Sequence, residues 1–219
     1  MALPMIDLTH QGPFCSVTPI VLASASPRRQ QLLTSLGIHF AVHPSRVTEG
    51  PPVPGETPHD YAVRMARDKA ADVALQRPDA VVLGYDTIVV TRDAMLGKPT
   101  DRLHALDMLR CLNGDTHRVV SGWSMFWRGT AVRESAVATE VTFGSFPLAV
   151  LEAYSLTGEA MDKAGAYAIQ GAGAFLVKTV SGSVSNVIGL PLRETVAALL
   201  ELEAIGVDAA AENTEGSER

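Results

Sequence analysis

The sequence has few cysteines, few aromatic residues and no long uncharged apolar run. Its 219 residues include two cysteines, Cys15 and Cys111, whose spacing matches neither a metal-ligand pair nor a thioredoxin-like redox motif. We therefore expect two free or buried thiols in a reducing compartment, and no disulfide framework. No stretch approaches the roughly 20 uncharged apolar residues of a membrane span. These absences argue against a disulfide-rich secreted protein and against a membrane protein.

Positive charge is also scarce. The chain has 18 Lys and Arg against 24 Asp and Glu, a formal net charge of -6. This balance argues against sequence-independent nucleic-acid binding, which needs a broad basic face. The first twenty residues lack a basic start, and Asp7 and His10 interrupt any apolar run, so no signal peptide is expected. We expect a cytoplasmic protein without a nucleic-acid or membrane partner. The oligomeric state stays open, with a homodimer as one option.

Strand-like and helix-like apolar patterns alternate along the chain. Strands are expected over residues 20–23, 40–42, 80–84, 87–90, 119–127 and 131–143, and helices over residues 30–36, 57–75, 102–112, 146–155 and 191–205. Because helices and strands interleave and the last two strands form a hairpin, the fold class is α/β with a mixed sheet. We expect one domain over residues 19–207, preceded by an irregular arm, 1–18, and followed by an acidic tail, 208–219.

The segment Ser24-Ala25-Ser26-Pro27-Arg28-Arg29 follows the first expected strand. Ser26 suits the N-cap of a helix, and Pro27 suits its first position. Acidic residues are usual in a first turn, because the helix N-terminus carries partial positive charge. Arg28 and Arg29 instead gather with hydroxyls and free backbone N–H groups, which favours a phosphate site. The alternative is that both arginines point into solvent.

Asp86 is the second candidate site residue. It separates the apolar runs Val81-Val82-Leu83-Gly84 and Thr87-Ile88-Val89-Val90, so we expect it inside or at the end of a buried strand. A buried carboxylate needs a partner, a metal or a raised pKa, since an unpaired buried charge is costly. Ligand sites in open α/β sheets lie at strand carboxyl ends, which suits a metal ligand or a general base. A structural ion pair or a turn cap is the alternative.

Three further residues are weak candidates from spacing alone. Glu49 lies in a loop, and Lys69 lies on an expected helix beside other charged residues, where a solvated face is the simpler interpretation. Lys98 stands between Gly97 and Pro99, in a rigid turn that could hold an ammonium group against a phosphate.

Several common motifs are absent. Gly97-Lys98 is followed by proline and lacks the earlier glycine of a P-loop, and Gly171-Ala172-Gly173 lacks the third glycine of a dinucleotide fingerprint. There is no serine flanked by glycines as in a nucleophile elbow, and the histidines lack zincin spacing. These motif-based alternatives therefore fail.

Ordered blocks along the chain resemble the Maf family. The first is Ser24 to Arg29 with Leu32-Leu33. The others are Arg64-Met65-Ala66-Arg67-Asp68-Lys69-Ala70, Asp86-Thr87-Ile88-Val89, Gly97-Lys98-Pro99, Gly114-Asp115-Thr116-His117, Asp162-Lys163-Ala164-Gly165-Ala166-Tyr167, Ile169-Gln170-Gly171 and Asn186-Val187-Ile188-Gly189-Leu190-Pro191-Leu192. The similarity covers about residues 20–205.

This resemblance implies a two-lobed α/β/α architecture around an extended mixed sheet, similar to inosine-triphosphate pyrophosphatases. It implies hydrolysis of a nucleoside triphosphate to monophosphate and pyrophosphate, with a divalent cation, Mg²⁺ or Mn²⁺. By matching position, Asp86 is the expected catalytic residue and shares the metal with Glu49. Ser24, Arg29, Glu49, Lys69 and Lys98 are expected to line the phosphates and the metal.

Three positions separate subfamilies, and Arg28, Thr87 and Gln170 match the dTTP/UTP type. The chain departs from the family pattern at Tyr85, which stands before the aspartate and could narrow the cleft. Gly144, in place of a frequent arginine, and Ala160-Met161, in place of a proline-containing step, are further departures. The resemblance leaves two alternatives: a non-catalytic nucleotide-binding regulator of septum formation, and a house-cleaning pyrophosphatase of purine specificity.

Overall fold

A computed structural model describes residues 12–92 and 94–208. Its main sheet has seven strands in the order β3-β2-β4-β6-β7-β8, with β5 pairing with β4 off this path. They are β2 (Ile20–Leu22), β3 (Ala41–Val42), β4 (Val81–Val90), β5 (Met95–Leu96), β6 (Thr116–Trp127), β7 (Thr130–Phe143) and β8 (Val177–Ser181). β2 is parallel to β3 and β4, whereas the other pairs are antiparallel. The mixed sheet and the α/β class are thus confirmed.

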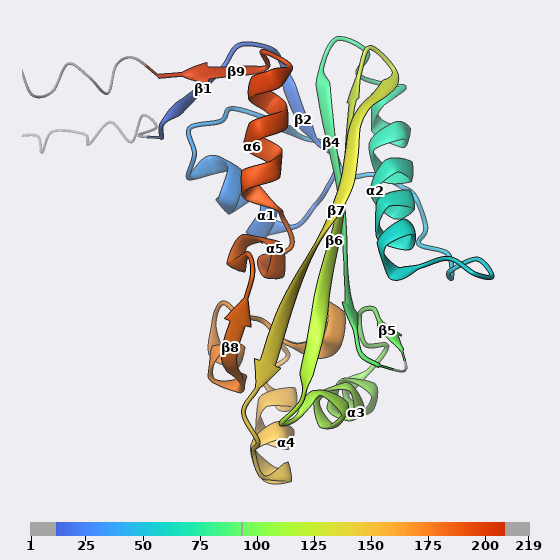
Figure 1. The fold of residues 1–219 in the computed structure, drawn as a ribbon, viewed down its shortest axis with the longest axis vertical. Helices are drawn as coiled ribbons and strands as arrows, with labels where there is room; N and C mark the ends of the chain where they lie inside the picture. Colours follow the sequence, from blue (N-terminus) through green and yellow to red (C-terminus); the bar gives the residue numbers. More distant parts are fainter. Residues whose placement is uncertain (1–11, 93, 209–219) are drawn as a thin grey trace, which may run out of the picture.

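The long strands β4, β6 and β7 run the length of the molecule and join two lobes (Figure 1). The helices are α1 (Pro27–Thr34), α2 (Pro58–Ala74), α3 (Arg102–Leu112), α4 (Leu148–Leu156), α5 (Val184–Ile188) and α6 (Leu192–Glu201). In one lobe α1 and α6 lie on one face of the strands and α2 on the other, while α3 and α4 close the other lobe (Figure 1). This is the expected two-lobed α/β/α arrangement.

Each lobe has its own apolar core. Leu33 of α1 and Leu199 of α6 pack with Leu83 of β4 on one side of the sheet, and Val73 of α2 packs with Val82 on the other. In the second lobe the core lies between the sheet and helices α3 and α4. Burial of such apolar surface is the main force that holds the lobes together.

Two glycines allow α2 to lie very close to the sheet. A Cβ atom on Gly84 of β4 would come within 2.2 Å of the Ala66 carbonyl oxygen. On the neighbouring strand, a Cβ on Gly122 would come within 2.1 Å of the Ala62 carbonyl oxygen. Gly122 is the register partner of Asp86. The missing side chains therefore bring α2 within reach of the strand position that carries Asp86.

The N-terminal arm is more ordered than the sequence predicts. Within it, β1 (Phe14–Ser16) pairs antiparallel with β9 (Ile205–Val207), a second small sheet. The closing helix α6 ends at Glu201 instead of continuing to 205, because Glu203 adopts a positive φ of 52° and the chain reverses into β9. This pairing joins opposite ends of the chain, so no local pattern indicates it. Residues 1–11 and 209–219 of the expected arm and tail lie outside the described residues.

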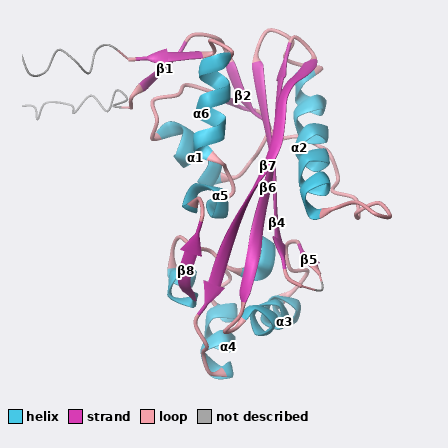
Figure 2. Cartoon of the chain, in the orientation of Figure 1, coloured by secondary structure: helices cyan, strands magenta, loops and turns pink. Residues whose placement is uncertain are grey.

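The glycine-rich stretch after α4, for which the sequence predicts no element, holds two short 3-10 helices, η1 (Ala164–Ala166) and η2 (Ala172–Leu176). The sequence analysis also missed β8 and α5, which are short. Figure 2 shows the segment between β3 and α2 as a loop. Within residues 12–92 and 94–208, none of the helices combines the length and the apolar character that crossing a bilayer requires.

Candidate active site

Asp86 lies inside one continuous strand. Of the two positions that the sequence allows, inside or at the end of a buried strand, the structure shows the first: residues 81–90 form β4, a ten-residue strand that Asp86 does not break. The reason is that the carboxylate has a partner: its Oδ1 accepts a hydrogen bond from Lys69 Nζ at 2.6 Å. Only 5% of the Asp86 surface is exposed. A buried, paired carboxylate is therefore presented in the middle of the sheet.

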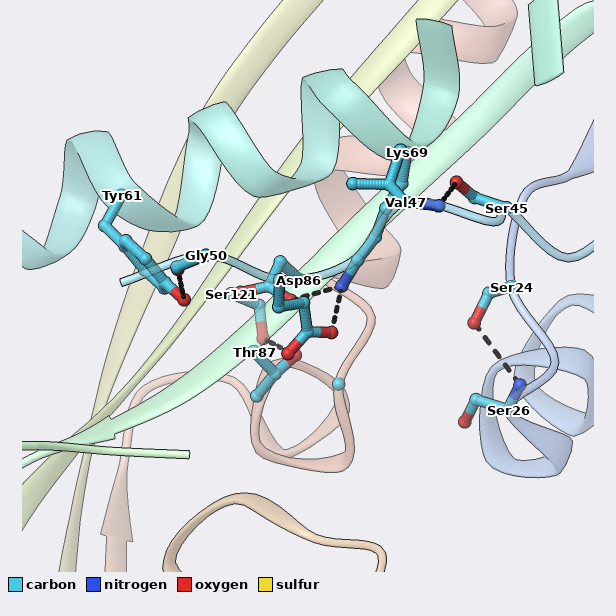
Figure 3. Close-up of polar contacts among 12 residues, drawn as sticks. Ser24, Ser26, Ser45, Val47, Gly50, Tyr61, Lys69, Asp86, Thr87 and Ser121 are labelled. Carbon is cyan, nitrogen blue, oxygen red and sulfur yellow. Dashed lines mark hydrogen bonds and ion pairs between the residues drawn. The ribbon is translucent and has the colours of Figure 1, made fainter. Parts of the chain in front are cut away.

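Lys69 bridges two carboxylates. Its ammonium nitrogen lies 2.6 Å from Asp86 Oδ1 (Figure 3). The same nitrogen lies 2.6 Å from Glu49 Oε1. The lysine side chain is 13% exposed and the Glu49 side chain 45%. A solvated helix face, the simpler interpretation from the sequence, is thus wrong for Lys69. The close packing of α2 on Gly84 and Gly122 explains why its side chain points inward.

The charges around Glu49 keep its carboxylate ionised. Burial by itself would raise the pKa of Glu49. The hydrogen bond and charge of Lys69 outweigh burial, together with the charges of Lys98 and Arg29, so that the pKa of Glu49 falls below its ordinary value. Lys98, on the exposed turn before Pro99, thus acts on this carboxylate through its charge.

Arg29 is held from three directions. Its Nε donates to the Gly189 carbonyl oxygen at 2.8 Å, Nη1 to Ser24 Oγ at 3.0 Å and Nη2 to Thr87 Oγ1 at 3.2 Å. The guanidinium also stands over the Tyr85 ring, 5.7 Å from its centroid. Burial lowers the pKa of Arg29, and the Asp86 charge opposes this effect. The guanidinium is therefore fixed in place before any ligand is present.

Arg28 points elsewhere. Its Nη1 forms an ion pair with Asp162 Oδ2 at 3.0 Å, and the Arg28 side chain is 25% exposed. The two arginines thus diverge, instead of meeting at one place as the sequence predicts. The expected N-cap also differs: Ser26 has the extended backbone of an N-cap residue but makes no capping side-chain hydrogen bond. Its own N–H donates to Ser24 Oγ at 3.3 Å.

Thr87 belongs to a buried chain of hydroxyl groups. Its Oγ1 accepts from Arg29 and shares a 2.9 Å hydrogen bond with Ser121 Oγ, which donates to the Asn186 carbonyl oxygen. Asn186 is fully buried and donates from Nδ2 to Thr139 Oγ1 at 3.0 Å. The sequence analysis missed Ser121, whose small polar side chain gives no signal within a long strand.

Gln170 lies on an exposed loop whose backbone is anchored. The Glu159 carboxylate accepts from the backbone N–H groups of Ala172 and Gly173 at 3.0 and 2.8 Å. Tyr154 donates to Glu159 Oε2 at 2.9 Å and accepts from Ala168 N at 3.2 Å. Glu159 and Tyr154, which the sequence analysis did not select, thus hold both sides of the Gln170 position.

A single cleft of ≈ 500 Å³ joins these groups. All nine site residues named from the sequence line it: Ser24, Arg28, Arg29, Glu49, Lys69, Asp86, Thr87, Lys98 and Gln170. Its lining has five lysines and arginines against three aspartates and glutamates, a positive excess in a chain of net charge -6. Such a cleft attracts a polyphosphate. We call Ser24, Arg29, Lys69 and Asp86 the floor, and Arg28 and Gln170 the rim.

The departures noted in the sequence do not narrow this cleft. Tyr85 is 1% exposed, donates or accepts a 3.0 Å hydrogen bond with Thr195 and packs in the core beneath Arg29. The expectation that Tyr85 narrows the cleft is thus wrong, since alternate strand residues face opposite sides. Gly144 and Ala160 lie outside the cleft lining, and Ala160 packs in the core of the other lobe.

The donor set fits a hard divalent cation. The described residues contain no cluster of three or more His, Cys, Asp or Glu side chains that could hold a metal by themselves. Mg²⁺, however, is usually bound by one or two carboxylates together with substrate phosphates and water. Asp86 and Glu49, which share one ammonium group, supply that pair of carboxylates.

Comparison with known proteins assigns the chain to a family. The model of the Maf-like protein family matches residues 19–202. A dTTP/UTP pyrophosphatase of Geobacter sulfurreducens is 46% identical over 85% of this chain and 97% of its own length. A dTTP/UTP pyrophosphatase of Geotalea uraniireducens is 48% identical over 85% of this chain and 96% of its own.

Among solved structures, a nucleoside-triphosphatase / dITP/XTP pyrophosphatase of Mycobacterium abscessus is 16% identical. The match covers 84% of this chain and 96% of that one with a TM-score of 0.40, a likeness too weak to bear on function. The family model and the relatives together cover nearly all of the described residues. The chain belongs to the Maf family.

Proposed function

We propose that the chain hydrolyses UTP and dTTP to the nucleoside monophosphate and pyrophosphate. One observation carries this proposal: the Lys69 ammonium lies 2.6 Å from both the Asp86 and the Glu49 carboxylate, in a cleft that also holds the fixed guanidinium of Arg29. The names of the relatives, dTTP/UTP pyrophosphatase, support the choice of substrate.

The floor suits attack of water on the α-phosphorus. A bond forms between the water oxygen and that phosphorus, the bond to the oxygen bridging the α- and β-phosphorus breaks, and pyrophosphate leaves. Asp86 orients the water and takes its proton, the role of a general base. Arg29, Lys69 and Lys98 offset the negative charge that grows on the phosphates, with Ser24 holding Arg29 in place.

Asp86 and Glu49 would also hold the divalent cation. When bound, the cation neutralises phosphate charge and polarises the phosphoryl oxygens. Two carboxylates and one ammonium group leave one net negative charge, so the addition of Mg²⁺ gives a site with one net positive charge. That balance favours a bound polyphosphate over an empty site.

The rim suits recognition of the base. Uracil and thymine present an N3–H donor between two carbonyl acceptors. The Gln170 carboxamide can accept a hydrogen bond from N3–H while it donates one to a neighbouring carbonyl oxygen. Arg28 lies at the same opening. Cytosine lacks the N3–H and would leave polar groups unpaired, which costs a few kcal/mol. Thr87, the third residue expected to read the base, has its hydroxyl engaged by Arg29 and Ser121.

A nucleotide panel tests the proposal. UTP, dTTP, CTP, ATP and GTP are incubated with the protein and Mg²⁺, and monophosphate, pyrophosphate and orthophosphate are measured. We expect equal amounts of monophosphate and pyrophosphate, a preference for UTP and dTTP, and loss of activity with chelator. Orthophosphate from the triphosphate would mean attack at the γ-phosphorus and contradict the proposed reaction. Preference for a purine would support the house-cleaning alternative, and binding without turnover would support the regulator.

A further inference from the structure

Glu49 owes its position to another element. It lies in the loop of residues 43–57 between β3 and α2, which contains no helix or strand. Backbone hydrogen bonding of a regular element therefore does not fix its carboxylate. The loop must be held by contacts with its surroundings if Glu49 is to stay 2.6 Å from Lys69 Nζ.

Helix α2 supplies these contacts. Near its C-terminal end, Asp72 Oδ2 accepts from Arg46 N at 2.8 Å and from Ser45 Oγ at 3.1 Å. Near its beginning, Tyr61 donates its hydroxyl proton to the Gly50 carbonyl oxygen at 3.0 Å (Figure 3). The helix that carries Lys69 thus also fastens the loop on both sides of Glu49.

A third contact follows Gly50. Arg64 donates from Nε to Glu56 Oε1 at 2.7 Å and from Nη2 to Oε2 at 2.8 Å. The same guanidinium lies over the Tyr61 ring, 5.3 Å from its centroid, and packs against that ring. Arg64 therefore supports the Tyr61 side chain as well as the end of the loop.

The Tyr61 contact is the one nearest to Glu49. Gly50 is the next residue in the chain, and a Cβ atom built on it would meet nothing within 4 Å. That side of Gly50 is therefore open, while the Tyr61 hydroxyl holds the Gly50 carbonyl from α2. Tyr61 also lines the cleft, as Glu49, Lys69 and Asp86 do.

We propose that Tyr61 is a positioning residue for Glu49. Its hydroxyl holds the Gly50 carbonyl and so sets the Glu49 carboxylate beside Lys69 and within reach of Asp86. This inference rests on the proposed function, in which Glu49 and Asp86 share a divalent cation. Tyr61 itself does not touch the cation or the reacting atoms; it reduces the freedom of one of the two ligands.

The test is Mn²⁺ binding to the full nucleotide-free chain, measured by titration calorimetry and by the paramagnetic resonance signal of free Mn²⁺. Loss of one hydrogen bond should raise the Mn²⁺ Kd of Tyr61→Phe about three- to tenfold. The Mg²⁺ concentration for half-maximal activity should rise by the same factor, while kcat at saturating Mg²⁺ is mostly retained. A purely structural role would lower Tm without moving Kd.

Two variants serve as references. Tyr154→Phe removes the same atom from a tyrosine beside the Gln170 loop, where the hydroxyl bonds to Glu159, and should leave the Mn²⁺ Kd unchanged. Glu49→Gln removes the ligand charge and should weaken Mn²⁺ binding more than Tyr61→Phe does. Weaker binding in Glu49→Gln with an unchanged Kd in Tyr61→Phe would overturn the inference and leave the proposed function intact. A parent chain that binds no Mn²⁺ would contradict the shared cation itself, and the inference with it.

Discussion

The floor and the rim of the cleft differ in how firmly their side chains are held. On the floor, Arg29 makes three hydrogen bonds and Lys69 two ion pairs. On the rim, Arg28 makes one ion pair with an exposed partner. Gln170 is exposed and makes no hydrogen bond to another residue that the structure describes. The side chains of the floor are therefore held more firmly than those of the rim.

This difference matches the tasks that we propose for the floor and the rim. Stabilising charge in a transition state requires donors that are in place beforehand, since reorganisation during the reaction costs free energy. Reading a base needs only groups that complete their hydrogen bonds on binding. Changes on the floor should therefore reduce turnover of every nucleotide, and changes on the rim should alter the ratio between nucleotides.

The largest effect is expected from Asp86→Asn. The variant keeps the shape of the side chain but removes its charge, so kcat for UTP should fall at least about a hundredfold, the range typical of lost acid–base participation. The measurement is the initial rate of pyrophosphate release at saturating Mg²⁺. Asp107→Asn, on the exposed face of α3, is the matched control and should retain parental activity. Near-normal turnover by a folded Asp86→Asn would remove Asp86 from the proposed mechanism.

A smaller loss is expected from Arg29→Lys. Lysine keeps the charge but cannot reach Ser24, Thr87 and Gly189 together, so kcat/KM should fall about tenfold or more for all nucleotides alike. The matched control is Arg128→Lys, the same substitution at a position away from the cleft, in the turn of the β6–β7 hairpin beside Trp127. Its kcat/KM should stay parental. If Arg29→Lys shifted the preference between UTP and CTP instead, the division between floor and rim would be wrong.

The sequence predicts the elements that have strong local patterns. The helix over residues 102–112 is found with the same bounds, and Pro27 begins α1 as expected. It does not predict the β1–β9 pair, whose strands lie at opposite ends of the chain. The sequence places Asp86 inside or at the end of a buried strand but does not decide between the two, because the ion pair that makes its burial tolerable comes from Lys69 on another element.

The sequence predicts which residues gather at the candidate site, but not the hydrogen bonds and ion pairs that they make there. The nine site residues expected from the sequence all line the cleft, but Tyr61, which also lines it, was not among them. The local sequence pattern does not predict where the Arg28 side chain points, because its ion-pair partner, Asp162, lies in the other lobe. The same holds for Tyr85, whose place beneath Arg29 follows from strand alternation once the strand is known to be continuous. Contacts between distant segments thus account for what was missed.

On the rim, Gln170→Glu and Arg28→Trp should reduce the preference for UTP over CTP about tenfold, while kcat for the better substrate changes less. Gln170→Glu removes the amide donor, and Arg28→Trp removes the ion pair with Asp162. The measurement is the ratio of kcat/KM values for UTP and CTP in each variant. An unchanged ratio in both variants would show that neither residue reads the base.

The smallest effect, and the sharpest test of the boundary between floor and rim, is expected from Thr87→Val. The family resemblance predicts a base-reading role for Thr87, but its hydroxyl lies between Arg29 Nη2 and Ser121 Oγ. If it holds Arg29, the variant should lose about three- to tenfold in kcat/KM for every nucleotide, without a change in their ratio.

Ser121→Ala separates the two roles, because Ser121 is fully buried, lies outside the cleft lining and cannot touch a base. If Thr87 holds Arg29 through this hydroxyl chain, Ser121→Ala should produce the same uniform loss, though a smaller one. The double variant should then be no worse than Thr87→Val alone, since coupled residues are not additive. A changed UTP to CTP ratio in Thr87→Val, with Ser121→Ala at parental rates, would instead give Thr87 the base-reading role that the family resemblance predicts.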